Sequence, residues 1–154
     1  MLVFIILVVA LLARTLNLGS FGIWYDEKIS LISASGISEH QFPANGEAVK
    51  LFLPPFPSVK QATIDNTGGN SIAYHLLLKH WIKIFGNSDV AIRLLSVFFA
   101  MLALIAGFSL AKKITSSSRV ALIALALMAI HPLLIEFARE AKSYSMALFF
   151  SIAA

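Results

Sequence analysis

The sequence predicts an all-α integral membrane protein, and three observations carry this prediction. Hydrophobic residues make up 58% of the 154 positions, charged residues only 13%, and the mean hydropathy is +0.84. In ordinary globular domains about a quarter of the residues are charged. Long apolar runs alternate with short polar segments, and such runs cross a bilayer as helices because a helix satisfies its own backbone hydrogen bonds.

The overall charge and the cysteine count exclude several other classes. The chain has no cysteine, which excludes a disulfide framework or a thiolate metal site. Its net charge of +4 is spread thinly, whereas nucleic-acid binding requires a clustered basic face. The expected partner is therefore the lipid bilayer, and no nucleic acid is expected.

The first predicted span covers residues 2–18. Residues 2–13 are uninterrupted apolar, and a helix continued to Leu18, at about 1.5 Å per residue, is just long enough for a hydrocarbon core of about 30 Å. A cleaved signal peptide is the alternative. No basic residue precedes the apolar run and no A-x-A-like site follows it, so a retained membrane helix is favoured.

Residues 19–89 are predicted to form a long loop on one side of the membrane, because no apolar run in this range is long enough to span. A Pro-rich patch lies at residues 53–57. We expect a short helix from about Tyr25 to Ser35, and a turn at residues 65–70 with Asn70 or Ser71 as the N-cap of the next helix. Loops of this length usually carry function.

Residues 72–85 are predicted to form an amphipathic helix in the membrane interface. Their polar side chains fall within one arc of a helix, and the rest are apolar or aromatic; these polar residues are His75, Lys79, His80 and Lys83. Metal binding by the two histidines is disfavoured, because residues five apart diverge on a helix.

Two further spans are predicted at residues 92–111 and 120–135. The second contains His131-Pro132, and the proline is expected to kink it. The loop between the spans, residues 112–119, carries three positive charges and no negative one, which places it in the cytoplasm. The 19–89 loop and the charged hinge at 136–144 then share the outer face. The lysines of the 19–89 loop weaken the evidence for this orientation. That loop, however, exceeds the roughly 60 residues over which the positive-inside rule counts.

A new apolar run follows the hinge and is interrupted where the sequence stops. Residues 144–154 are therefore expected to be a truncated fourth span, and the chain to be the N-terminal part of a longer membrane protein. Four charges in the hinge favour the interface, since each costs roughly 2.5 to 3.5 kcal/mol at mid-bilayer.

The adjacent carboxylates of Asp26 and Glu27 are the first candidate site. They follow Trp24 and Tyr25 just outside the first apolar run. A solvated turn or the first turn of a helix explains the pair equally well, and interfacial aromatics are common. If the topology holds, the pair shares a face with the cationic hinge. Transfer of a sugar from a lipid-linked phosphate needs a carboxylate to take a proton from the acceptor and positive charge to stabilise the departing phosphate.

The order and spacing of several blocks also resemble the N-terminal part of bacterial GT-C glycosyltransferases, among them dolichyl-phosphate-mannose-protein mannosyltransferases and the aminoarabinose transferase of lipid A. The blocks are residues 24–27, 69–78, 81–89, 93–96 and 137–144. The resemblance implies a GT-C-like bundle of transmembrane helices whose extracytoplasmic first loop carries juxtamembrane helices. It also implies a polyprenyl-phosphate-linked sugar as donor, an acceptor that is a protein, lipid or glycan, and an inner or plasma membrane location.

The resemblance assigns roles to five residues. Asp26 is the expected catalytic base with Glu27 in support, and Arg139, Lys142 and Tyr144 are expected to contact the donor phosphate. No cofactor is assigned, and a divalent metal is left open. Two positions depart from the family pattern: Lys142 stands where Arg is usual, which replaces a fork of donors by a point charge, and residues 67–71 replace a Pro-rich or Glu-Lys-Pro block. Full members have more spans, so this piece is not expected to be active alone.

Two other classes compete with the transferase. A transporter or channel fragment also uses intramembrane polar groups, but places charges within its spans more often. A non-catalytic multi-span protein needs no site at all. Further apolar spans encoded downstream would favour the transferase.

Overall fold

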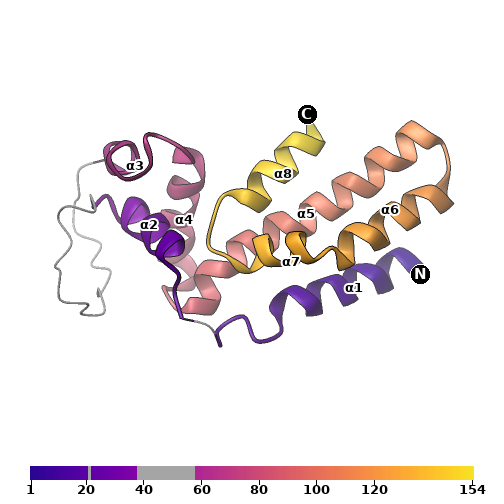
Figure 1. Cartoon of the computed structure of the whole chain (residues 1–154), viewed down its shortest axis with the longest axis horizontal. Helices are drawn as coiled ribbons and strands as arrows, with labels where there is room; N and C mark the ends of the chain where they lie inside the picture. Colours follow the sequence, from indigo (N-terminus) through magenta and orange to yellow (C-terminus); the bar gives the residue numbers. More distant parts are fainter. Residues whose placement is uncertain (21, 38–57) are drawn as a thin grey trace. The chain divides into compact units, whose positions relative to one another are not determined.

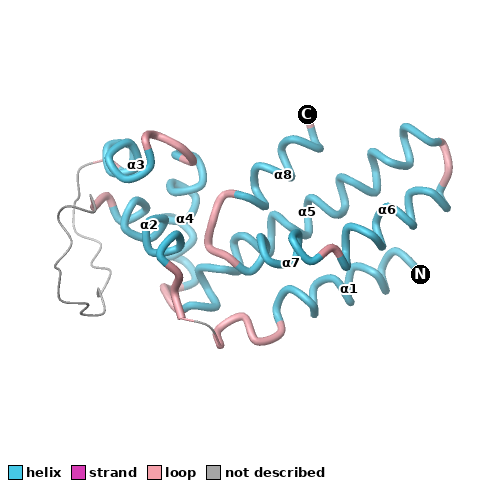
Figure 2. Tube along the Cα trace, viewed as in Figure 1, coloured by secondary structure: helices cyan, strands magenta, loops and turns pink. Residues whose placement is uncertain are grey.

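A computed structural model describes residues 1–20, 22–37 and 58–154, and these residues form helices, turns and short connections without a strand (Figures 1 and 2). The predicted all-α class is therefore confirmed. The predicted Pro-rich patch at residues 53–57 lies outside the described residues. The chain divides into two compact units. We call Met1–Phe21 with Arg93–Ala154 the spanning unit, and Gly22–Ile92 the loop unit.

The spanning unit is built on α1 (Leu2–Thr15), α5 (Asp89–Thr115, whose first residues belong to the loop unit) and α6 (Ser118–Ile130). Its core joins these three helices through a small set of buried side chains: Ala10, Leu104, Leu125 and Ala129. Many large apolar side chains stay exposed on the outer faces of α1, α5 and α6. Such faces are typical of helices that contact lipid.

The helix α5, with 27 residues, is long and apolar enough to cross a membrane. It contains the span predicted at 92–111. The helix α1 ends at Thr15, three residues earlier than predicted, because the chain turns at Leu16 and Asn17 takes a positive φ of 58°. At about 1.5 Å per residue its 14 residues fall short of a 30 Å core. Its crossing of the membrane stays a prediction.

The span predicted at 120–135 is broken, as the proline indicated. The helices α6 and α7 (Pro132–Arg139) meet at a bend of 57°, and together they are long and apolar enough for one broken span or a re-entrant loop. His131 adopts extended backbone between them, and Pro132 is the first residue of α7. The helix α7 continues through Glu136 to Arg139, so the first part of the predicted hinge is helical. After a turn, α8 (Tyr144–Ala153) follows.

In the part of the loop unit that the structure describes, α2 (Tyr25–Ser35) packs on both α3 and α4. The predicted bounds of α2 are confirmed. The helix α3 (Val59–Thr67) was not predicted. The turn expected at residues 65–70 begins only at Gly68, whose φ of 65° ends α3 in a left-handed conformation. Sequence alone favoured a turn there because Asp65, Asn66 and Thr67 are poor helix formers.

The helix α4 (Ile72–Phe85) has the predicted bounds, and Ser71 is its N-cap, with a φ of 68° and no side-chain hydrogen bond to the helix. The predicted polar arc is wrong at His75. This side chain is 2% exposed and packs inward with Tyr74, Leu78 and Ile82. The exposed face instead carries Leu76, Leu77 and Ile84 beside His80 and Lys83.

Candidate active site

The acidic pair lies at the N-terminus of α2, where its two members differ sharply in exposure. Asp26 is exposed, whereas Glu27 is only 1% exposed. One carboxylate oxygen of Glu27, Oε2, accepts the backbone N–H of Trp24 at 3.1 Å. This reaches back from the first turn to the residue before the helix, as in one half of a capping box. Glu27 therefore stabilises the start of α2, and the neighbouring Asp26 is presented at the surface.

Polar contacts from α3 fix the other end of α2. Asn66 donates through Nδ2 to the Ser33 hydroxyl at 3.0 Å and to the Ile37 carbonyl at 2.9 Å. A buried hydrogen bond of 2.9 Å joins Thr63 Oγ1 to His75 Nδ1 and ties α3 to α4. Since buried polar groups are costly unless paired, these contacts select one packing of the three helices. The helix that carries Asp26 is thus joined, at its other end, to a residue far along the chain.

The cationic candidates gather at the turn between α7 and α8. Lys142 Nζ lies 5.4 Å from the centre of the Tyr144 ring, a cation–π distance. The other flank of this turn is the Phe137 ring, whose centre is 4.5 Å from that of Tyr144. Ser96 on α5 donates to the Lys142 carbonyl at 3.1 Å. The structure therefore brings Lys142 and Tyr144 together and anchors their backbone to the long helix.

Arg139 contacts the segment that follows α1. Its Nη2 donates to the carbonyl of Leu16 at 3.2 Å. Close by in sequence, the Leu18 carbonyl accepts from Nη1 of Arg93 at 2.6 Å, and Arg93 is 2% exposed. Two arginines from different helices thus hold the segment that follows α1. Its carbonyls lie where a helix end has a negative partial charge, which explains the choice of cations. The role of Arg139 at a donor phosphate stays a prediction.

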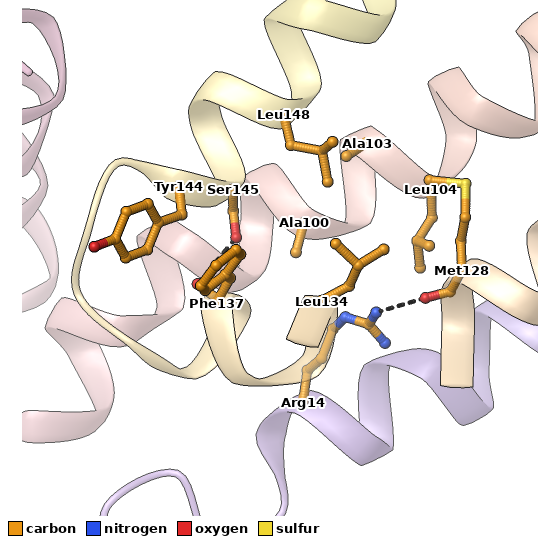
Figure 3. A pocket seen from close by; sticks show the side chains of 10 residues that line it. All are labelled: Arg14, Ala100, Ala103, Leu104, Met128, Leu134, Phe137, Tyr144, Ser145 and Leu148. Carbon is orange, nitrogen blue, oxygen red and sulfur yellow. Dashed lines mark hydrogen bonds between the residues drawn. The ribbon is translucent and has the colours of Figure 1, made fainter. Parts of the chain in front are cut away.

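Sequence reasoning missed a third arginine, Arg14 on α1. It is 1% exposed and lines a small cavity of about 10 Å³ between α1, α5, α6, α7 and α8 (Figure 3). That volume holds about one water molecule. The signal was present, because Arg14 is the one charged residue before Asp26, and an ionisable side chain at the end of an apolar run marks a functional or structural site.

The five predicted site residues fall into two groups. Asp26 and Glu27 belong to the loop unit, and Arg139, Lys142 and Tyr144 belong to the spanning unit. Within the described ranges, no three His, Cys, Asp or Glu side chains are grouped so that they can hold a metal ion. The two groups therefore differ in chemistry. The group in the loop unit has one exposed carboxylate at the start of a helix, and the group in the spanning unit is a cationic turn between α7 and α8.

The described helices and the long apolar span are those of an all-α membrane protein. The family model of dolichyl-phosphate-mannose-protein mannosyltransferases matches residues 70–154, more than half of the chain. The chain belongs to the dolichyl-phosphate-mannose-protein mannosyltransferase family. Neither the search of curated proteins nor the search of solved structures gave a match.

Family membership implies a membrane glycosyltransferase of the GT-C type. The matched residues include α4 to α8, and so the cationic turn with Arg139, Lys142 and Tyr144. The acidic pair precedes the matched range. The family match therefore supports the class of reaction, and the assignment of Asp26 stands on its chemistry and exposure.

Proposed function

We propose that the protein transfers a sugar from a polyprenyl-phosphate donor to a hydroxyl-bearing acceptor at the outer face of the cell membrane. The observation that carries this proposal is the turn between α7 and α8. It places Lys142 over the Tyr144 ring, 5.4 Å from its centre, between the amphipathic helix α7 and the apolar helix α8. A phosphate on a long isoprenoid tail suits such a place, because the tail requires lipid and the phosphate requires cations at the boundary.

The chemistry needs few groups. The acceptor hydroxyl loses its proton to a carboxylate as its oxygen bonds to the anomeric carbon, and the bond from that carbon to the phosphate oxygen breaks. The bonding electrons leave with the polyprenyl phosphate, so no general acid is required. In this proposal Asp26, the exposed member of the pair, accepts the proton of the acceptor hydroxyl. Positive charge near the phosphate lowers the barrier by stabilising the developing negative charge.

Glu27 has a supporting role in this proposal. Its contact with Trp24 fixes the first turn of α2, and its negative charge at a helix N-terminus is itself favourable. Arg139 and Lys142 supply the cations, and Tyr144 supplies a ring against which the lysine packs. The outer location rests on the positive charges of Lys112 and Lys113 in the last turn of α5 and of Arg119 in the first turn of α6, which favour the cytoplasm.

The donor class is tested with membranes that contain the full-length protein. They are incubated in parallel with labelled polyprenyl-phosphate sugars and with labelled nucleotide sugars, and release of polyprenyl phosphate is followed. We expect consumption of a polyprenyl-phosphate sugar, and its loss in the Lys142→Met variant at equal membrane abundance. Arg119→Met, which removes an exposed cation from the first turn of α6, is the matched control. Direct use of a nucleotide sugar would contradict the proposal.

A further inference from the structure

Arg14 is a buried cation inside an apolar helix. A charged side chain in apolar surroundings is costly unless it finds partners. It is 1% exposed, and its guanidinium donates three hydrogen bonds, all to backbone carbonyls: Ala10 at 3.0 Å, Ala129 at 3.0 Å and Met128 at 3.3 Å. A carboxylate is not among these acceptors. The carbonyls that accept from Arg14 indicate its role in the fold.

The two acceptors on α6 have lost their ordinary donors. In an uninterrupted helix the Met128 carbonyl accepts from the amide of residue 132 and the Ala129 carbonyl from that of residue 133. Residue 132 is proline, which has no N–H. His131 is extended, with φ −64° and ψ 120°, and it ends α6 before Leu133. Both carbonyls therefore belong to the last turn of a helix, whose carbonyls find no donor within that helix.

We propose that Arg14 is the C-terminal cap of α6, a side-chain substitute for the two amides that the break at His131-Pro132 removes. Nη1 donates a hydrogen bond to the Ala129 carbonyl, and Nη2 donates one to the Met128 carbonyl. The fork of the guanidinium fits two neighbouring acceptors. The same carbonyl end carries a partial negative charge, which offsets the charge of the buried arginine. The break and the buried cation are thus partners through Nη1 and Nη2, while Nε of Arg14 is buried without a hydrogen-bond partner.

The cap also fastens the bend to α1. Nη1 bridges the Ala10 carbonyl on its own helix and the Ala129 carbonyl on α6, and α1 packs on both α6 and α7. Figure 3 shows the guanidinium between α1 and the end of α6, with its bond to Met128 drawn. Breaking this contact should loosen the start of α7. The inference does not depend on the proposed sugar transfer.

The proposal predicts that the stability contributed by Arg14 depends on the presence of Pro132. In the full chain, purified in detergent, Arg14→Leu should lower the unfolding midpoint by about 5–10 °C, because two buried carbonyls lose their donors. In a Pro132→Ala background residue 132 regains an N–H for the Met128 carbonyl, so the same substitution should cost less than half as much. Arg119→Leu, which removes an exposed arginine from the first turn of α6, should change the midpoint by about 1 °C or less in both backgrounds.

An equal loss in the two backgrounds would overturn the cap, since Arg14 would then stabilise the protein through contacts unrelated to the break. If Arg14→Leu does not accumulate in membranes, accumulation becomes the readout. The double variant Arg14→Leu with Pro132→Ala should then accumulate to at least about threefold the level of the single variant, which corresponds to roughly 0.6 kcal/mol. Equal absence of both would equally overturn the proposal.

Discussion

The buried hydrogen bond between Thr63 and His75 should hold α3 against α4. Thr63 is 0% exposed and His75 is 2% exposed, and the bond from Oγ1 to Nδ1 measures 2.9 Å. Thr63→Val keeps the shape of the side chain and replaces the hydroxyl with a methyl group, so the ring of His75 loses one buried partner. That loss costs about 1–3 kcal/mol, or a factor of about 5–150 in the opening equilibrium.

Hydrogen exchange measured by mass spectrometry on the purified chain tests this directly, because local opening sets the exchange rate of these amides. Peptides from α3 and α4 should exchange faster by about 5–150-fold in Thr63→Val, with peptides from α5 unchanged. Thr115→Val makes the same chemical change at an exposed position at the end of α5, and should leave α3 and α4 as they are. Exchange in Thr63→Val within about twofold of wild type would refute the reasoning.

Two further predictions concern topology and the donor phosphate. With single cysteines in this cysteine-free chain, Asp65→Cys should be labelled by an impermeant thiol reagent in intact cells and Thr115→Cys should be shielded; the reverse pattern would separate the predicted site residues from the outer face. Lys142→Arg should keep substantial transfer activity, since a phosphate accepts the guanidinium fork, while Lys142→Met should lose on the order of 2–4 kcal/mol of transition-state stabilisation. Near-normal turnover of both lysine variants would leave Lys142 as a helix-end residue that reaches toward the interface.

The helices that sequence reasoning placed correctly carry strong local signals. The helix α2 ends at a glycine with a φ of 78°, and α4 ends at another with a φ of 86°, and both glycines stand next to apolar periodic runs. The break in α6–α7 was readable for a similar reason, because a proline cannot donate the hydrogen bond that would continue the helix. Local chemistry decided these elements.

The features that were predicted wrongly depend on contacts between residues that are distant in sequence. His75 was assigned to a polar face by its spacing, but Thr63 on another helix gives it a buried partner. The helix α3 has weak helical propensity and is stabilised by packing on α2 and α4. Asn66, which sequence reasoning placed in a turn, instead bonds to Ser33 and Ile37. Propensity is a weak guide where tertiary contacts of this kind decide the outcome.

The candidate site was foreseen in part for the same reason. The acidic pair and the cationic turn were visible in the sequence as charges next to apolar runs. The different roles of the residues within each group were not. Only the structure shows that Glu27 is buried against the backbone of Trp24 while Asp26 is exposed. The arginines at positions 14, 93 and 139 bond to carbonyls that are distant in sequence, and nothing in the local pattern of residues gives those partners.

The central claim is that Asp26 takes the acceptor proton in sugar transfer from a polyprenyl phosphate. The most direct measurement is the turnover of a labelled polyprenyl-phosphate sugar by membranes with the full-length wild type, Asp26→Asn, or Asp65→Asn at equal abundance. Asp65 is an exposed aspartate of the same unit and serves as the matched control. The account predicts that Asp26→Asn lowers turnover by roughly 100-fold or more with normal membrane insertion, and that Asp65→Asn stays within about twofold of wild type. Turnover by Asp26→Asn close to wild type would contradict it.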